Sequence, residues 1–350
     1  MSFLIYGSTG YTGNLIVRQA VQRGLKPILA GRDVDKVGRQ AAALGLEWRA
    51  FRLSNTAALE RALSDTGLVL LLAGPYINTS QPVVEACLRT GAHYLDITGE
   101  IDVYEALAAR DSDAKKHAVM LGTGMGFDVV PTDCLANHLK GRLPTATELK
   151  LAFTFRGSPG VSHGTLKSGL GQMPRGLRVR RGGKLVSVPA GEKSMVVDFG
   201  WEPRSCDLYG WGDVSTAWYS TGIPDIEDYA PANPVTGRLL KLAATSRRLL
   251  GWELTRSLAG ALIKLIPNGA TPEQRQRTHG VVWGQVSDPA GGCAEARLQM
   301  MEAYNFTAQS ALLAVEKLLA GGAKPGFQTP AMAFGDDFVL EIEGTTREDL

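Results

Sequence analysis

The chain has 350 residues, 44% of them hydrophobic, and a formal net charge of +2. This length predicts about two domains, the apolar share excludes disorder as the default state, and the near-neutral charge argues against nucleic acid as a partner. We expect no transmembrane segment, because no uncharged apolar run approaches the roughly 18 residues that would span a bilayer. The dispersed cysteines Cys87, Cys134, Cys206 and Cys293 predict buried, reduced thiols in a cytoplasmic protein and no metal site.

A glycine-rich turn follows the first apolar run, Phe3 to Tyr6. Glycines recur there at every third residue, and the residues behind them repeat at helical spacing, which predicts a strand, a turn and a helix. Such a turn lets the backbone approach a pyrophosphate, and the helix N-terminus points free N–H groups at it. We therefore predict that a dinucleotide is bound by Gly7, Ser8, Thr9, Gly10, Tyr11 and Thr12.

The second predicted strand, residues 27–32, ends in Gly31 and Arg32, where a chain that binds NAD would place an acid. Arg32 is suited to pair with a 2′-phosphate, and Lys36 adds a weaker cation one turn later. The sequence therefore predicts NADP(H) in preference to NAD(H). Asp33 opposes this preference unless its carboxylate caps the following helix.

The alternation of strands and helices then continues, with strands expected at 47–51, 68–72, 92–97 and 119–121 and helices at 56–63, 81–89 and 102–116. Ligands bind outside the carboxyl ends of such strands. The residues expected to border the cofactor there are Ala73, Gly74, Pro75, Tyr76 and Gly124. The pattern predicts an α/β fold, a doubly wound parallel sheet of the Rossmann type, over residues 1–128.

A different pattern begins near residue 145, where apolar and polar residues alternate over 149–155 as in a half-buried antiparallel strand. Ser162 is expected to cap a helix, and 201–234 reads as loop. Further strands are predicted at 184–188, 194–199, 280–286, 295–301 and 338–342, and a helix at 304–319. Residues 239–266 are apolar with scattered basic residues, which fits either packed helices with a solvated basic face or peripheral contact with a membrane surface or a lipid-like substrate.

Several blocks together resemble the saccharopine dehydrogenase (NADP-binding) family. They are residues 7–13, 30–32, 73–76, 91–100, 126–133, 162–165, 283–286 and 329–335. The chain is more similar to the saccharopine dehydrogenase-like oxidoreductases, including bacterial trans-acting enoyl reductases, than to the lysine-pathway enzyme. The resemblance implies a second α+β domain with a mixed sheet over 129–325, a homodimer, and a tail, 326–350, that returns to the nucleotide domain. The chain departs from the family pattern at His163 and Gln285, so the resemblance predicts the cofactor better than the substrate.

Hydride transfer also needs a proton donor beside the nicotinamide. None of the nine tyrosines has a lysine four residues later, which disfavours the Tyr-Lys pair of short-chain reductases. The candidates are polar groups near strand ends: Tyr76, Tyr94 with Asp96, Glu100, Asp128 and His163. For Tyr94 and Asp96, which share one strand face, a structural hydrogen bond is favoured, and Glu100 has an alternative as a helix-capping carboxylate. We name Tyr76, Asp128 and His163 as catalytic candidates, with structural alternatives as a packing tyrosine, a helix-capping carboxylate and a structural histidine. We expect an NADPH-dependent reductase of a C=C or C=N bond in a small or acyl-type substrate. The rivals are a catalytically silent NADPH-binding sensor or scaffold, and a protein of lipid surfaces.

Overall fold

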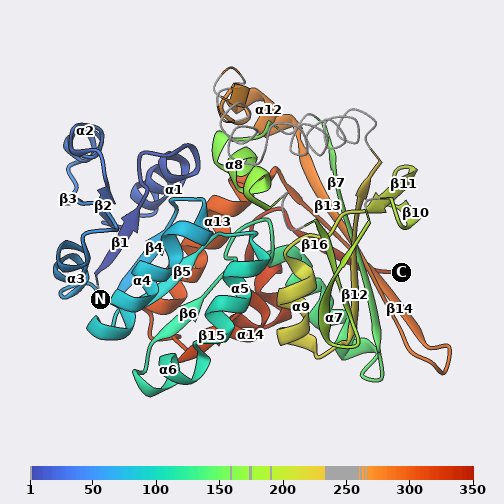
Figure 1. Cartoon of the computed structure of the whole chain (residues 1–350). Coiled ribbons are helices and arrows are strands. Elements are labelled where there is room, and N and C mark those ends of the chain that lie inside the picture. The colour runs from blue at the N-terminus through green and yellow to red at the C-terminus, as the bar shows by residue number, and fades with distance from the viewer. Residues whose placement is uncertain are drawn as a thin grey trace, which may run out of the picture.

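The computed structural model describes residues 2–157, 160–172, 176–189, 191–232, 260, 262–263, 265 and 267–350, and two sheets organise them. Figure 1 shows the first sheet with the N-terminal half of the chain on the left and the second sheet on the right. Most of the apolar, basic stretch 239–266 lies outside the described residues.

The first sheet has seven strands in the order β15-β6-β5-β4-β1-β2-β3, and every described pairing within it is parallel. Its strands are β1 (Phe3–Tyr6), β2 (Ile28–Gly31), β3 (Trp48–Ala50), β4 (Leu68–Leu71), β5 (His93–Asp96), β6 (Met120–Gly122) and β15 (Gly326–Gln328). Leu68–Leu71 is buried along its whole length, as expected of a central parallel strand. The predicted doubly wound sheet is confirmed.

The connecting helices are α1 (Tyr11–Gln22), α2 (Val34–Leu44), α3 (Thr56–Leu63), α4 (Tyr76–Thr90), α5 (Ile101–Ala108) and α6 (Asp111–Lys116). The apolar residues of α1 that repeat at helical spacing, Ile16, Val17 and Ala20, are buried against the sheet. Asp33 caps α2 by accepting from the Lys36 N–H. Two predicted bounds were wrong, because α4 begins five residues earlier than 81 and the single helix at 102–116 is two helices.

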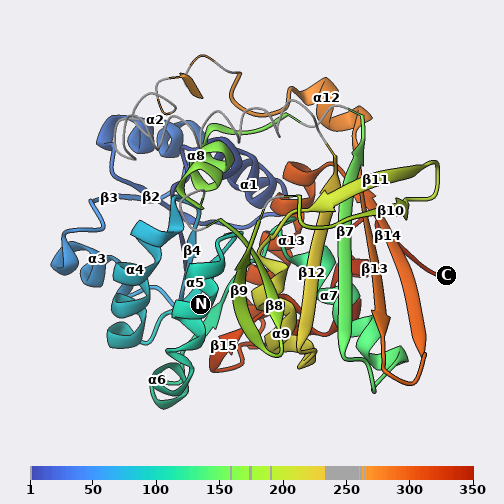
Figure 2. The same ribbon diagram turned by 45° about the vertical axis from the view of Figure 1, so that its right-hand side comes forward.

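The second sheet has nine strands, with the path β10-β11-β12-β7-β13-β14-β16 and β8 and β9 beside it. They are β7 (Glu148–Arg156), β8 (Leu177–Arg181), β9 (Lys184–Val188), β10 (Ser194–Asp198), β11 (Pro203–Leu208), β12 (Asp225–Pro231), β13 (His279–Ser287), β14 (Cys293–Met301) and β16 (Thr346–Asp349). The sheet is mixed, since β12 runs parallel to β7 while β13 runs antiparallel to β7 and to β14. Figure 2 shows β12, β7, β13 and β14 standing side by side.

The remaining helices are α7 (Val130–Arg142), α8 (His163–Gln172), α9 (Asp213–Thr221), α12 (Pro272–Arg277), α13 (Ala303–Leu319), α14 (Pro330–Phe334) and the 3₁₀ helix η2 (Asp336–Glu341). Ser162 caps α8 as expected, because its Oγ accepts from the Thr165 N–H at 3.1 Å. α7 packs on β13 and β14, and α13 packs on α1, so helices fill the space between the two sheets.

Three expectations about the second half were wrong. Residues 201–234 are not loop throughout, because they contain β11, α9 and β12; their glycines and aromatic residues conceal the short apolar repeats. Residues 338–342 are mostly 3₁₀ helix instead of strand. Cys293 is exposed, while the other three cysteines are buried as predicted.

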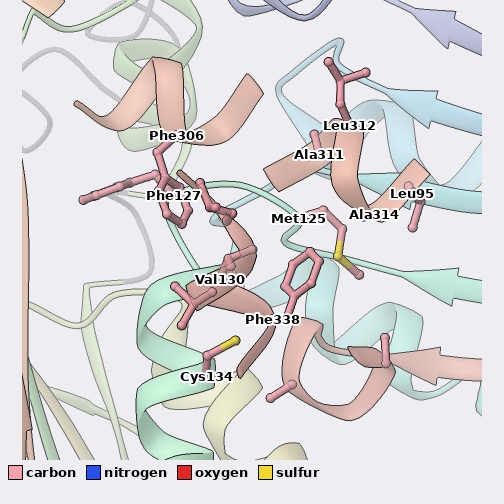
Figure 3. Close-up of a cluster of buried hydrophobic side chains, with 14 of the residues drawn as sticks. Leu95, Met125, Phe127, Val130, Cys134, Phe306, Ala311, Leu312, Ala314 and Phe338 are labelled. Carbon is pink, nitrogen blue, oxygen red and sulfur yellow. The ribbon is translucent and has the colours of Figure 1, made fainter. Parts of the chain in front are cut away.

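The C-terminal stretch 326–350 is shared between the sheets, since β15 pairs with β6 and β16 pairs with β14. Between the sheets lies one continuous core (Figure 3). Phe127, Val130 and Cys134 meet Phe306 from α13 and Phe338 from η2 there. The tail therefore helps to fix the loop between β6 and α7, which carries Asp128.

Candidate cofactor and active site

The turn between β1 and α1 accepts only glycine at two of its three glycine positions. Gly7 has φ +97°, and a Cβ there would lie 2.9 Å from both Ala73 N and Leu72 C. A Cβ on Gly13 would lie 2.3 Å from Gly7 O. Gly10 is different, because a Cβ would meet only Gly7 O at 3.3 Å and would otherwise point into open space. The space in front of Gly10 is where a pyrophosphate would lie.

The polar groups at this turn are those that an anion would satisfy. No side chain caps α1, and the N–H groups of Tyr11, Thr12 and Gly13 have no acceptor among the described residues. Ser8 Oγ is fully buried and also has no partner in that part of the chain. The side-chain amides of Asn14 and Gln40 stabilise the turn by hydrogen bonds. Asn14 donates to the carbonyls of Thr9 and Gly10, and Gln40 donates to the carbonyl of Ser8. The residues present thus fit a dinucleotide phosphate.

At the end of β2, Arg32 is exposed and makes no ion pair with any described residue. Lys36 is less available, because its Nζ lies 3.4 Å from Asp33 Oδ2. Asp33 Oδ1 caps α2 by accepting from the backbone N–H of Lys36. This hydrogen bond, and the charged side chain of Lys36, lower the pKa of the Asp33 carboxyl. The acid that opposed NADP(H) is therefore engaged, and Arg32 remains free to meet a phosphate.

The loop after β4 leads into α4 through a cis Gly74–Pro75 bond. Glu100 caps this helix from outside, since its two carboxylate oxygens accept from the Tyr76 and Ile77 N–H groups, each at 2.9 Å. Ser168 Oγ of α8 donates to the same carboxylate at 2.7 Å. The α4 N-terminus is thus filled by a carboxylate, whereas the α1 N-terminus is left open for a ligand.

Asp96, at the end of β5, holds the neighbouring loops in place. It accepts from the Tyr94 hydroxyl at 2.7 Å, the Thr123 hydroxyl at 2.8 Å and the Gly124 N–H at 2.8 Å. Burial raises the pKa of Asp96 to about 6, while these hydrogen bonds work in the opposite direction. Gly124, expected beside the cofactor, has its N–H occupied by Asp96. The hydrogen bond from the Tyr94 hydroxyl to the same carboxylate fits a structural role for the Tyr94–Asp96 pair.

Asp128 lies in the loop between β6 and α7, half-buried, and its carboxylate has no hydrogen-bond partner in the described part of the chain. Burial raises the pKa of this carboxyl to about 7. It lines a cavity of about 20 Å³, room for roughly one water molecule, together with Phe127, Thr132, Phe153, Trp211, Asp213 and Val282. A carboxyl with a pKa near neutrality is suited to give up a proton at physiological pH.

A further buried carboxyl, that of Asp213, lines this cavity, and the charge of the buried Asp228 acts on it; neither acid was predicted from the sequence. Asp213 begins α9 and accepts from Thr132 Oγ1 at 2.5 Å. Burial, and then the charge of Asp228, raise the pKa of Asp213. Asp228 Oδ2 accepts from the backbone N–H of Trp211 at 3.2 Å. The other oxygen of this carboxylate, Oδ1, is buried without a partner among the described residues. The sequence does not point to Asp213, because it predicts a loop over 201–234 where the structure has α9.

Tyr76 is buried at the start of α4. Burial raises the pKa of its hydroxyl strongly, and the charges of Asp96, Glu100 and Asp128 raise it further. A hydroxyl surrounded by carboxylates holds its proton tightly, so it is better suited to orient a substrate than to ionise.

His163 lies elsewhere, at the start of α8, where its N–H donates to Asn268 Oδ1 at 2.9 Å. Its neighbour Ser162 bonds to the Tyr304 hydroxyl, and the Tyr304 ring packs edge-on against Tyr11 at 4.9 Å. Tyr11 in turn donates to Ala270 O at 2.6 Å. Figures 1 and 2 both show α8 and α12 at the same end of the molecule as α1. His163 is thus placed towards the glycine turn and not in the cavity that Asp128 lines.

Comparison with known proteins agrees with this geometry. Residues 3–121 match the family described as saccharopine dehydrogenase NADP binding domain. Over these residues the chain is similar to the NADP-binding domain of that family. The resemblance and the NADP(H) cofactor expected from the sequence are confirmed over this range, and the glycine turn with Arg32 lies inside it.

Two groups of relatives each match part of the chain. A saccharopine dehydrogenase-like oxidoreductase of Homo sapiens is 26% identical over 214 residues, which is 53% of this chain and 50% of the relative. A trans-acting enoyl reductase of Mycobacterium ulcerans is 31% identical over 153 residues, which is 40% of this chain and 35% of the relative. The matches thus span half or less of the length of these relatives.

Solved structures extend the likeness to the whole fold. Saccharopine dehydrogenase (L-Glu forming) from Saccharomyces cerevisiae aligns over 100% of this chain and 99% of its own, with a TM-score of 0.66 and 12% identity. Homospermidine synthase from Legionella pneumophila, in complex with NAD, aligns over 100% and 91% with a TM-score of 0.64 and 10% identity. At this identity the likeness concerns the fold alone.

The described residues contain no group of three or more His, Cys, Asp or Glu side chains arranged to hold a metal ion. None of their helices has both the length and the apolar character needed to cross a membrane.

Proposed function

We propose that this chain is an NADP(H)-dependent oxidoreductase that reduces a C=C or C=N bond of a small or acyl-type substrate, with Asp128 as the proton donor. The observation that carries the proposal is the Asp128 carboxyl, which has a pKa of about 7 and borders an aromatic cavity beside the nucleotide domain. Three aromatic rings, of Phe127, Phe153 and Trp211, line this cavity beside the carboxyl, which is a local source of protons.

When bound, NADPH supplies the hydride for one end of the double bond. The glycine turn and the α1 N-terminus would hold the pyrophosphate, and Arg32 the 2′-phosphate. Asp128 gives a proton from its carboxyl oxygen to the other end of the bond, which leaves a carboxylate that solvent reprotonates. Asp213, held by Thr132, keeps a second carboxyl facing the cavity. The cavity of about 20 Å³ has to widen to admit a substrate.

The test is NADPH oxidation, followed by absorbance, with two probes: a trans-2-enoyl thioester and a cyclic imine. We expect one probe to be reduced by the unmodified protein, and we expect Asp128→Asn to lower kcat by about 10²–10⁴-fold while NADPH binding is unchanged. Asp225→Asn is the matched control, because this acid at the far end of β12 caps a turn and should leave the rate unaffected.

Experiments on the same purified protein distinguish this proposal from its two rivals. Tight NADPH binding with no turnover of either probe would favour the silent sensor or scaffold. Flotation with anionic vesicles would favour the lipid-surface protein, although the segment in question, 239–266, lies mostly outside the described residues. Retained turnover in the Asp128→Asn variant would remove Asp128 from its role.

We also propose a homodimer and a cytoplasmic location. A dimer would cover part of the second sheet, and a protein that sediments as a monomer at micromolar concentration would contradict it. The location rests on the four cysteines, all of which are free, as expected in a reducing compartment.

A further inference from the structure

A second unpaired arginine lies next to Arg32 at the edge of the nucleotide sheet. Arg32 directly follows β2, Arg52 is the second residue after β3, and these strands run parallel with Gly31 opposite Ala50. The ladder continues beyond this pair, because the Phe51 N–H donates to Gly31 O at 3.0 Å. Neighbouring strands lie about 4.8 Å apart, so two arginines that follow paired strand ends can bring their guanidinium groups to one point.

Tyr6 fixes where this point lies. Its ring packs 5.2 Å from the ring of Phe51, and its hydroxyl donates to Phe51 O at 2.9 Å, so it reaches from β1 across β2 to the end of β3. Burial raises the pKa of the Tyr6 hydroxyl, and the positive charges of Arg32 and Arg52 both act against this rise. Both arginines are thus near the same hydroxyl.

Two neighbouring basic side chains, those of Arg49 and Lys36, are paired with acids, and Arg32 and Arg52 are not paired with any described residue. Arg49, on β3 itself, forms two bonds with Asp65 at 2.6 and 2.8 Å, and Lys36 pairs with Asp33. Arg32 and Arg52 are exposed, and neither forms an ion pair or side-chain hydrogen bond with a described residue. Two adjacent like charges without counter-charges repel each other, and an anion between them removes that cost.

We propose that Arg52 is the second ligand of the NADP(H) 2′-phosphate, so that two strand ends set the preference over NAD(H). A phosphate dianion offers three oxygens and can accept from two guanidinium groups at once. Arg32 approaches it from β2 and Arg52 from β3. This role concerns binding alone and holds whichever bond the protein reduces.

Direct titration tests the proposal without a substrate. NADPH, NADH, adenosine 2′-monophosphate and adenosine 5′-monophosphate are titrated into the unmodified protein and into Arg52→Ala. We expect Arg52→Ala to weaken binding of NADPH and of adenosine 2′-monophosphate by about tenfold, and binding of NADH and adenosine 5′-monophosphate by less than about twofold. Arg52→Lys should recover part of the loss, since a point charge replaces a planar fork.

Arg61→Ala is the matched control, because Arg61 is equally exposed but lies in the last turn of α3, away from the carboxyl ends of the strands. It should leave all four affinities unchanged. Unchanged NADPH affinity in a folded Arg52→Ala protein would overturn the proposal. An equal loss for NADPH and NADH would overturn it too, because Arg52 would then contact the adenosine and not the phosphate.

Discussion

We predict that Arg32 carries the cofactor preference, and because its side chain is exposed, it can be replaced without disturbing the core. A charge-assisted contact between guanidinium and phosphate is worth about 1.5–3 kcal/mol, roughly a ten- to hundredfold change in affinity. We expect Arg32→Ala to weaken NADPH binding by about this factor and to leave NADH binding nearly unchanged, as measured by titration of both nucleotides. Equal losses would mean that Arg32 stacks on the adenine.

Asp128 should make stability depend on pH in a defined direction. The folded protein holds its proton more tightly than the unfolded chain does, with a pKa of about 7 against an ordinary value of about 3.9, so this carboxyl lowers the free energy of unfolding as pH rises from about 4 to 7. Asp128→Asn removes this fall in the free energy of unfolding, because the amide does not titrate. We expect the variant to gain about 1–3 kcal/mol over the unmodified protein at pH 8 and little at pH 4, measured by urea unfolding.

Asp96 is the matched comparison for this pH effect, because its raised pKa accompanies hydrogen bonds from Tyr94, Thr123 and Gly124. Asn at this position cannot accept all of them, so Asp96→Asn should destabilise the protein at every pH. Identical curves of unfolding free energy against pH for the Asp128→Asn variant and the unmodified protein would show that Asp128 titrates at its ordinary pKa.

At the scale of elements, a substitution in the turn between β1 and α1 can remove dinucleotide binding without preventing folding. Gly10→Val leaves φ at an ordinary −70° and meets one backbone atom at 3.3 Å, so the protein should fold. The added side chain would occupy the place of the pyrophosphate, so dinucleotide binding should be lost. Calorimetric titration of the folded variant with NADPH tests this, and unchanged affinity would remove this turn from the cofactor site.

Gly13 provides the contrast on the same helix. A Cβ there would lie 2.3 Å from Gly7 O and 2.7 Å from Ser8 O, two backbone atoms that cannot move without opening the turn. We expect Gly13→Ala to lower the free energy of unfolding by more than about 2 kcal/mol, and Gly10→Val by about 1 kcal/mol or less. Thermal unfolding of the two variants measures the difference, and equal stability would contradict the packing of α1 on its turn.

At the scale of the whole molecule, the C-terminal stretch joins both sheets, but only one junction supports the nucleotide domain. β15 pairs with β6, and Phe327 is buried beside it. β16 pairs with β14 at the edge of the second sheet and, among the described residues, makes no strand contact with the nucleotide sheet. We expect removal of 344–350 to preserve NADPH affinity and removal of 324–350 to abolish it, as measured by titration of both truncated chains.

The nucleotide half was largely predictable, because its signals are local. The spacing of Gly7, Gly10 and Gly13, the apolar run at Leu68 to Leu71 and the helical repeat of α1 each specify structure within a few residues. The second half was less predictable, since its glycines and aromatic residues pack against partners far along the chain. The helix α9 was missed for this reason, and with it Asp213.

The sequence by itself determined the order of strands and helices in the nucleotide domain, the glycine turn and the arginine at the end of β2, since each depends on neighbouring residues alone. Only the tertiary structure decided which acids meet. Thr132 and Asp213 are 81 residues apart yet bonded at 2.5 Å, and they share a cavity with Asp128. Burial produced by that packing, and not the chain near Asp128, raises the pKa of its carboxyl. The same packing placed His163 towards the glycine turn, and strand pairing brought Arg52 beside Arg32.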